Sequence, residues 1–220
     1  MNKKVLITGS TGFIGSHILE NFIELGYEVV GVSRSEKNHL TVTKNISDIT
    51  DWSDVLDGVE IIIHCAAAVH KMNSSKQVLE DYEKLNVQGT LNLANQAKGS
   101  VKRFIFLSTV KVHGEESFSN KFFADDVLNP ADPYSESKLK AENGLKKIAE
   151  SSKMELVIIR PPLVYGPNPK GNLKKLSHYI RKNIPLPFKC VNANSRSMVY
   201  IRNLVDFIYI CSEHKAAANQ

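Results

Sequence analysis

The sequence predicts an α/β fold built on a doubly wound parallel sheet, and three observations lead to this prediction. Continuous runs of Val, Ile and Leu alternate with amphipathic stretches of helical length. The apolar runs lack the alternation of half-exposed strands, which indicates strands covered on both faces. A glycine-rich segment, TGSTGFIG, joins the first apolar run to the first amphipathic stretch. Helices on both faces of a parallel sheet account for all three observations.

The first half of the chain supplies three strands and two helices. Residues 3–8 and 28–33 are short apolar runs, and the segment 16–25 between them repeats its apolar residues with helical spacing. EIIIHCA at 60–66 is a third buried strand, and a helix is predicted around 78–98. This order gives the βαβ units of a parallel sheet.

The second half continues the same order. RFIFLST at 103–109 and ELVIIR at 155–160 are predicted strands, and 134–151 is a predicted helix. Asp132 and Pro133 begin that helix, because aspartate suits the N-cap and proline suits the first helical position.

The composition changes after residue 160, where six prolines frame a loop-rich, basic stretch. Prolines interrupt regular structure and frequently mark loops. We therefore predict a larger domain at residues 1–165 and the start of a smaller lobe at 166–220.

The composition is that of an ordinary soluble chain with one substantial core. Of its 220 residues 42% are hydrophobic, and no segment approaches the roughly eighteen apolar residues of a membrane helix. Only three apolar residues follow the lysines near the start, which is too few for a signal peptide. The three cysteines lie far apart without a CxxC pair, which favours a reducing compartment and predicts no metal site. We expect a cytoplasmic protein without membrane insertion.

Positive charge is concentrated in one part of the chain. The net charge is +5, yet residues 137–189 hold twelve lysines and arginines against three glutamates. A basic region attracts nucleic acid, a membrane surface or a phosphorylated small molecule, although a solvated lysine-rich helix face has the same composition. The stretch lacks a recognition motif and interleaved aromatic residues, so we predict no nucleic-acid partner.

The glycine-rich segment predicts a nucleotide site. Gly9, Gly12 and Gly15 lie between the first strand and the first helix. Such a turn lets backbone N–H groups approach a diphosphate at the positive end of a helix. Side chains at Gly9 or Gly12 would block the approach, and Gly15 allows close packing of helix and strand. In this βαβ order the turn predicts a dinucleotide-binding Rossmann fold.

The end of the second strand bears on the choice of cofactor. NAD sites usually place an acid there, whereas an arginine accommodates the extra phosphate of NADP. The sequence has no acid there but has Ser33 and Arg34. Arg34 favours NADP, yet an arginine at this position also stacks on adenine. NAD and NADP therefore both remain open.

A tyrosine and a lysine are placed for proton transfer. Tyr134 falls in the first turn of the predicted helix, and Lys138 follows one turn later on the same face. A free tyrosine, with a pKa of about 10, is a poor base at neutral pH. The lysine charge, the helix N-terminus and an oxidised nicotinamide would each lower that pKa. The pair predicts an acid/base for a sugar hydroxyl, although a surface Tyr-Lys pair has the same spacing.

Six segments, in order, resemble one known family. TGSTGFIG, HCAA, NVQGT, FLSTVKVHG, YSESK and RPPLVYGP are together similar to the extended short-chain dehydrogenase/reductase family. The resemblance covers essentially the whole chain. Its nearest branch is the nucleotide-sugar epimerases, dehydratases and 4-reductases of surface-polysaccharide synthesis.

The resemblance implies a role for each matching residue. Tyr134 would be the acid/base, Lys138 would bind the nicotinamide ribose, and Thr109 would hydrogen-bond the reacting oxygen, with Ser108 as the reserve candidate. Arg196 would hold the sugar-nucleotide diphosphate, and Asn86 would support the site from behind. The implied cofactor contacts are Gly9, Thr11, Gly12, Phe13, Ile14, Gly15, Arg34, Asp48, Ile49, Ala66, Ala67, Ser108, Tyr134, Lys138 and Pro161.

The chain departs from the family pattern in four places. His113 stands where the family has Tyr, so we expect altered packing. Val110 and Lys111 replace the Asp and Glu of the dehydratases, which argues against water elimination. Leu163 stands where many epimerases have Asn. The family continues well beyond residue 220, so we expect a chain shortened at its C-terminus.

The resemblance implies an NAD(P)-dependent C4 epimerase that acts on a UDP-hexose or UDP-N-acetylhexosamine. An NADPH-dependent 4-keto-sugar reductase is the alternative, because the same motifs serve both reactions and Arg34 favours the reductase. A non-catalytic dinucleotide sensor is a further alternative, although such proteins tend to lose the Tyr-Lys pair. A family-style homodimer would use the helices around 78–98 and 134–151.

Overall fold

The computed structural model describes residues 2–34, 40–69, 76–117, 121–167, 171–185 and 195–220. Six parallel strands form one sheet in the order β3-β2-β1-β4-β5-β6. The strands are β1 (Lys4–Thr8), β2 (Glu28–Ser33), β3 (Thr41–Thr43), β4 (Val59–His64), β5 (Arg103–Leu107) and β6 (Glu155–Ile159). The fold-class prediction is confirmed: the domain is a doubly wound parallel sheet of the Rossmann type.

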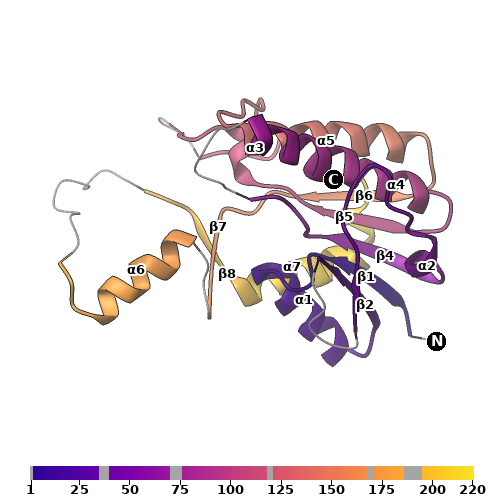
Figure 1. Cartoon of the computed structure of the whole chain (residues 1–220), viewed down its shortest axis with the longest axis horizontal. Helices are drawn as coiled ribbons and strands as arrows, with labels where there is room; N and C mark the ends of the chain where they lie inside the picture. The colour runs from indigo at the N-terminus through magenta and orange to yellow at the C-terminus, as the bar shows by residue number, and fades with distance from the viewer. Residues whose placement is uncertain (1, 35–39, 70–75, 118–120, 168–170, 186–194) are drawn as a thin grey trace.

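Helices cover both faces of this sheet (Figure 1). α3 (Lys76–Asp81), α4 (Thr90–Ala97) and α5 (Pro133–Glu150) lie on one side, and α1 (Phe13–Glu24) and α7 (Ile201–Glu213) lie on the other. A π-helical segment, η1 (Tyr82–Gly89), joins α3 to α4, and the short α2 (Ser53–Leu56) precedes β4.

The core consists of two apolar layers, one on each face of the sheet. In β1, Leu6 packs with the α4 and α5 side, whereas Val5 and Ile7 pack with α1 and α7. In β5, Phe104 packs in the layer beneath α4 and α5, and Ile105 packs in the layer with α1 and α7. Successive side chains of a strand point to opposite faces, which explains why continuous apolar runs form these strands.

A smaller unit branches from the sheet. β7 (Leu163–Tyr165) pairs in parallel with β8 (Met198–Tyr200), and α6 (Gly171–Arg181) lies apart from both helical layers (Figure 1). After β8 the chain returns, and α7 packs beside α1 in the core of the sheet. The boundary at residue 165 stays a prediction, but the last helix is thus packed with the larger unit.

The predicted elements are all present, with shifted ends. α1 begins at Phe13, three residues before the predicted start, and β4 and β5 each end two residues early. The next residues, Cys65 and Ser108, still donate to the carbonyls of Thr8 and Ile159, but neither strand continues beyond them. The sequence reasoning missed the elements β3, α2, β7, α6, β8, α7, η2 (Val110–His113) and η3 (Lys215–Ala217). Among the described residues, no helix has the length and apolar character needed to cross a membrane.

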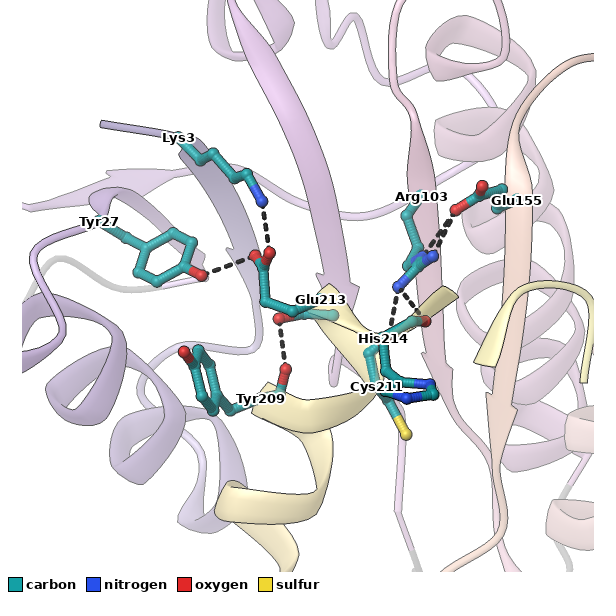
Figure 2. A network of polar contacts seen from close by, with 9 residues as sticks. Lys3, Tyr27, Arg103, Glu155, Tyr209, Cys211, Glu213 and His214 are labelled. Carbon is teal, nitrogen blue, oxygen red and sulfur yellow. Dashed lines mark hydrogen bonds and ion pairs between the residues drawn. The ribbon is translucent and has the colours of Figure 1, made fainter. Parts of the chain in front are cut away.

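α7 is fixed to the amino ends of the strands by a polar network (Figure 2). Glu213 accepts hydrogen bonds from Lys3 and from the Tyr27 hydroxyl, the latter at 2.7 Å. Arg103, which is 3% exposed, donates to the carbonyl oxygens of Cys211 and His214 at 2.7 and 3.1 Å, and its guanidinium pairs with Glu155. The last carbonyls of a helix lack intrahelical partners, and here the buried Arg103 donates hydrogen bonds to the carbonyls at the end of α7.

Candidate active site

The predicted site residues follow neighbouring strands at the carboxyl edge of the sheet. The glycine turn follows β1, Arg34 follows β2, Ala66 and Ala67 follow β4, and Thr109 follows β5. Ligands of doubly wound sheets bind at this edge, where the strand order reverses beside the first strand. The parallel order of β2, β1, β4 and β5 therefore brings these segments to one edge.

The glycine turn has the shape that the sequence predicts. Gly9 has φ +69°, and a Cβ there would lie 2.8 Å from the backbone nitrogen of Ala66. A Cβ on Gly15 would lie 2.2 Å from the carbonyl oxygen of Gly9. Both positions therefore require glycine, Gly9 for its backbone angle and Gly15 for the close approach of helix to turn.

Gly12 leaves the start of α1 open. It is the N-cap residue of α1, and no side chain caps the helix or places an acid in its first turn. The first N–H groups of a helix have no intrahelical partner and bind anions well. The half-buried Thr11, Phe13 and Ile14 flank this position. The turn thus fits the diphosphate of a dinucleotide.

His64 supports the turn from the end of β4. It is fully buried, with Nδ1 2.8 Å from the Thr8 hydroxyl and Nε2 2.9 Å from the Thr90 hydroxyl. Burial, with the nearby charge of Lys138, lowers its pKa to about 3. The Thr8 hydroxyl also accepts from the amide of Ala66 at 3.3 Å. A neutral His64 therefore links β1, β4 and α4 beneath the site.

Asn86 joins the segment after β4 to α5. Its side chain accepts from the amide of Ala68 at 2.7 Å and donates to the carbonyl of Ala68 at 3.2 Å. Its Nδ2 also donates to the Ser137 hydroxyl at 2.9 Å, which in turn donates to the carbonyl of Tyr134 at 2.7 Å. Asn86 is 1% exposed. It therefore joins the segment after β4 to the start of α5, and its supporting role stays a prediction.

Tyr134 lies in the first turn of α5, as predicted. Asp132 caps the helix by accepting from the Ser135 amide at 2.7 Å, and Pro133 is its first residue. The Tyr134 ring is half-buried and meets the Tyr82 ring edge-on, 6.0 Å between centroids. Burial, with the charges of Asp132 and Tyr82, raises its pKa to about 12. The net effect is thus opposite to the predicted lowering, because desolvation dominates here.

Lys138 is buried one turn after Tyr134. It is 1% exposed, and Nζ lies 4.0 Å from the centroid of the Phe106 ring. Burial lowers its pKa to about 7, although the charges of Cys65 and Glu142 oppose that shift. A buried lysine with a pKa near neutrality is typical of a functional site.

Thr109 reaches the same region from β5. It is the half-buried N-cap of η2, and its hydroxyl accepts from the amide of Lys111 at 3.3 Å. Lys111 also pairs with Asp132 at 2.7 Å, so the turn after Thr109 is tied to the cap of α5. The neighbouring Ser108 is buried and donates to Glu142 instead. Of the two candidates, Thr109 is therefore the one whose hydroxyl is not taken up by Glu142.

Comparison with known proteins decides the family. The model of the NAD dependent epimerase/dehydratase family matches residues 5–220. The chain belongs to this family. The predictions of an enzyme and of the extended dehydrogenase/reductase relationship are therefore confirmed, and NAD is the cofactor of the family.

Individual members of the NAD-dependent epimerase/dehydratase family are similar over the whole chain. UDP-glucose 4-epimerase of Vibrio cholerae is 42% identical over 100% of this chain and 70% of its own length. An N-acetyl-α-D-glucosaminyl-diphospho-undecaprenol 4-epimerase of Escherichia coli O157:H7 is 33% identical over 94% of the chain and 62% of its own. The crystal structure of UDP-glucuronic acid 4-epimerase from Bacillus cereus with UDP-glucuronic acid and NAD superposes with a TM-score of 0.85 at 25% identity, covering 97% of this chain and 74% of that one.

The remaining residues implied by the family pattern are Arg34, Asp48, Ile49, Pro161 and Arg196. Arg34 is exposed after β2, and Asp48 and Ile49 form an exposed turn, with Ile49 85% exposed. Pro161 accepts from the amide of Val110 at 3.1 Å. Arg196 is exposed just before β8. These positions fit the family pattern, and their roles remain predictions.

The sequence reasoning missed a buried charged cluster behind Thr109. Glu142 is fully buried and pairs with Arg160 at 2.7 Å. Arg160 in turn lies 3.3 Å from Nε2 of His113, whose ring stacks on Phe122. The sequence feature that could have indicated this cluster is the spacing of Glu142, one helical turn after Lys138. His113 is thus packed between Arg160 and Phe122, and the altered packing expected there stays a prediction.

Proposed function

We propose that the protein is an NAD-dependent nucleotide-sugar 4-epimerase that acts on a UDP-hexose or UDP-N-acetylhexosamine in the synthesis of surface polysaccharides. The observation that supports it best is the placement of Tyr134 and Lys138 one turn apart at the start of α5, which is tied through Asp132 and Lys111 to the turn that carries Thr109. This arrangement occurs in a chain 42% identical to a UDP-glucose 4-epimerase.

The glycine turn and the segment after β4 would hold the cofactor. The open N-terminus of α1 fits its diphosphate, since Gly12 provides no side chain there. Ala66 and Ala67 would line the path to the nicotinamide, and Lys138 would bind its ribose. When bound, oxidised NAD would accept a hydride from C4 of the sugar and return it, and would add positive charge near Tyr134.

Tyr134 would move the proton of the C4 hydroxyl. With a pKa of about 12 it is a neutral phenol at pH 7, which is the form that returns a proton to the sugar oxygen. Removal of the proton requires positive charge nearby, which Lys138 supplies while protonated. Thr109 would hold the reacting oxygen, and Arg196 the diphosphate of the substrate.

The test is an epimerisation assay with purified protein, NAD and a panel of UDP-sugars, followed by chromatography of both C4 epimers. Tyr134→Phe removes only the hydroxyl, so folding and NAD affinity should persist while turnover falls by about 10²- to 10⁴-fold. Glu155→Gln, at the opposite edge of the sheet, is the matched control and should retain turnover. Equal turnover in Tyr134→Phe and the parent would contradict this mechanism.

A 4-keto-sugar reductase is the second candidate, and Arg34 favours it. This arginine is exposed after β2, and no acid precedes it in that strand end. Tight NAD retained through purification supports the epimerase. A preparation that instead binds added NADPH tightly and reduces a UDP-4-keto-sugar supports the reductase.

We also propose a cytoplasmic homodimer formed through α4 and α5. These helices lie on the same face of the sheet (Figure 1). Light scattering after gel filtration would give the mass, and a monomer at micromolar concentration would refute the dimer.

A further inference from the structure

Glu142 is a fully buried carboxylate at the centre of the charged cluster. It follows Lys138 by four residues and therefore lies on the same face of α5. Oε1 accepts from the Ser108 hydroxyl and from Nε of Arg160 at 3.1 Å, and Oε2 accepts from Nη2 of Arg160 at 2.7 Å. Both of its oxygens are therefore engaged.

These contacts join three segments around Thr109. Ser108 directly precedes Thr109 at the end of β5, and Arg160 directly follows β6. Arg160 extends the cluster by donating to the carbonyl of Ala124 at 2.9 Å and by its contact with His113 in η2. Displacement of Glu142 would therefore loosen the strand end on one side of Thr109 and the turn on the other.

Glu142 also follows the buried Lys138 by one turn on the same face of α5. The Phe106 ring of β5 lies beneath Nζ of Lys138, and the charge of Lys138 interacts with His64 at the end of β4, with Cys65 directly after it, and with Glu142. Burial lowers the pKa of Lys138, and the negative charge of Glu142 opposes that shift. A neutral residue in place of Glu142 would remove a negative charge that favours the ammonium form of Lys138.

We propose that Glu142 is a positioning residue for the reaction: through Ser108 and Arg160 it fixes the strand end that presents Thr109, and it places a buried carboxylate one helical turn after Lys138 on the same face of α5. The effect on turnover rests on the proposed epimerase function. The effect on Lys138 does not depend on any substrate.

The chain offers a matched control at the other end of the same two strands. Arg103 is the first residue of β5 and Glu155 the first of β6, and the two pair at 2.6 Å. This second arginine–glutamate pair lies at the amino edge of the sheet (Figure 2). Glu155→Gln therefore weakens another arginine–glutamate pair, at the opposite end of β6, without touching the site.

The first experiment measures the titration of Lys138 by NMR with carbon-labelled lysine, its signal identified by its loss in Lys138→Met. In Glu142→Gln, Lys138 should titrate at a lower pH than in the parent. In Glu155→Gln it should titrate as in the parent. Glu142→Asp keeps the charge and should restore the parent titration. The same titration in Glu142→Gln and the parent would overturn the charge coupling.

The second experiment measures kcat and KM across pH. Misplacement by about 1 Å near a reacting group can cost on the order of 10²-fold, so kcat of Glu142→Gln should fall by about that factor with little change in KM. The limb of the pH profile that reports Lys138 should move to lower pH. Glu142→Asp shortens the side chain, so its kcat should also fall, even if the glutamine variant does not fold.

The two proposals fail in different ways. A parent protein without activity on any UDP-sugar would contradict the epimerase function, while the NMR titration still tests Glu142. An active parent whose Glu142→Gln variant keeps both its kcat and its pH profile would overturn the positioning role.

Discussion

At the scale of single residues, His64 is the buried group whose protonation bears most directly on stability. It is held between the hydroxyls of Thr8 and Thr90, and it stacks on Phe106 with 5.9 Å between ring centroids. Its folded pKa is about 3, whereas an unfolded histidine titrates near 6.5. Between these values the unfolded chain binds one more proton than the folded protein. Folding is therefore favoured above pH 6.5 and weakened as the pH falls.

We expect the free energy of unfolding to fall by about 1.4 kcal/mol per pH unit below pH 6.5 from this group alone. His113, whose pKa is also lowered by burial and by Arg160, adds to the same slope. Urea unfolding at several pH values between 6.5 and 5 gives the slope of the free energy of unfolding against pH. This slope should be shallower in His64→Asn than in the parent. His178→Asn, an exposed site, should leave it unchanged. Parallel slopes in all three proteins would refute the assignment.

A substitution at Gly12 distinguishes the role of the glycine turn in nucleotide binding from its role in folding. Its φ of −74° suits any residue, and a Cβ would lie 3.0 Å from the Gly9 oxygen, a contact that requires that oxygen to move by a few tenths of an ångström. Gly12→Val should therefore fold yet lose measurable NAD binding, because its side chain would occupy the diphosphate position. Calorimetry measures this, with Gly99→Ala as the control, since a Cβ there meets nothing within 4 Å. Parent-like affinity in Gly12→Val would contradict the site.

At the scale of elements, the start of α5 and the π-helix η1 together place the tyrosine. Asp132 and Ser135 form a reciprocal capping box at the start of α5. η1 contributes both Tyr82, against the Tyr134 ring, and Asn86, which bonds Ser137. π-helical turns occur frequently at functional sites, since the extra residue redirects the side chains that follow.

Asp132→Ala should reduce the free energy of unfolding by about 1 kcal/mol, because the cap of α5 and the pair with Lys111 are both lost. Asp132→Asn keeps an oxygen for the Ser135 amide and should cost less. Thermal and urea unfolding of the two variants measure the difference. If alanine and asparagine proved equally destabilising, the cap would not be the cause.

Elements with a strong local pattern could be predicted, and those set by distant contacts could not. The sequence predicts β2 to the residue, since its apolar run ends at Ser33 and charged and polar residues follow. The three-residue strands β7 and β8 are too short and too exposed to show a pattern. α7 has helical spacing, but it follows the proline-rich stretch that suggested loops. The π-helix departs from the 3.6-residue period by which a helix is recognised.

Within the candidate site, too, residues in local motifs could be predicted and contacts between distant segments could not. The glycine turn, Tyr134 and Lys138 lie in short motifs with a fixed local geometry, so the sequence indicated them. Arg160 meets Glu142 only because β6 lies beside β5, and Lys111 meets Asp132 only when η2 folds against α5. Contacts between separate segments leave no spacing to recognise in one sequence.

At the scale of the whole molecule, one arginine–glutamate pair lies at each end of the sheet: Arg103 and Glu155 join β5 to β6, and Arg160 and Glu142 join the end of β6 to α5. Glu142 and Arg160 act at the carboxyl edge beside the site, and Arg103 and Glu155 act at the amino edge (Figure 2). Arg103 also donates hydrogen bonds to the carbonyls at the end of α7, so one side chain joins the sheet to that helix. The amino edge thus anchors the fold, while the carboxyl edge carries the chemistry.

Arg103→Leu should reduce the free energy of unfolding by about 3–5 kcal/mol, because Glu155 and two helix carbonyls lose a buried partner. Lys3→Ala breaks the more exposed pair with Glu213 and should cost at most about 1 kcal/mol. Urea unfolding at pH 7.5 compares the two. Similar losses in both variants would show that Arg103 is not an anchor.

The packing of α7 on the sheet has a consequence during synthesis. Ile201, Leu204 and Ile208 cover the same face of the sheet as α1, beside Ile105 and Val157. A ribosome releases residues 1–160 first, so the strands are complete while the apolar surface beneath α7 is still bare. Such surfaces bind chaperones or aggregate. The nascent chain therefore needs protection until α7 emerges, and a stalled product ending near residue 195 should be recovered with chaperones or in the insoluble fraction.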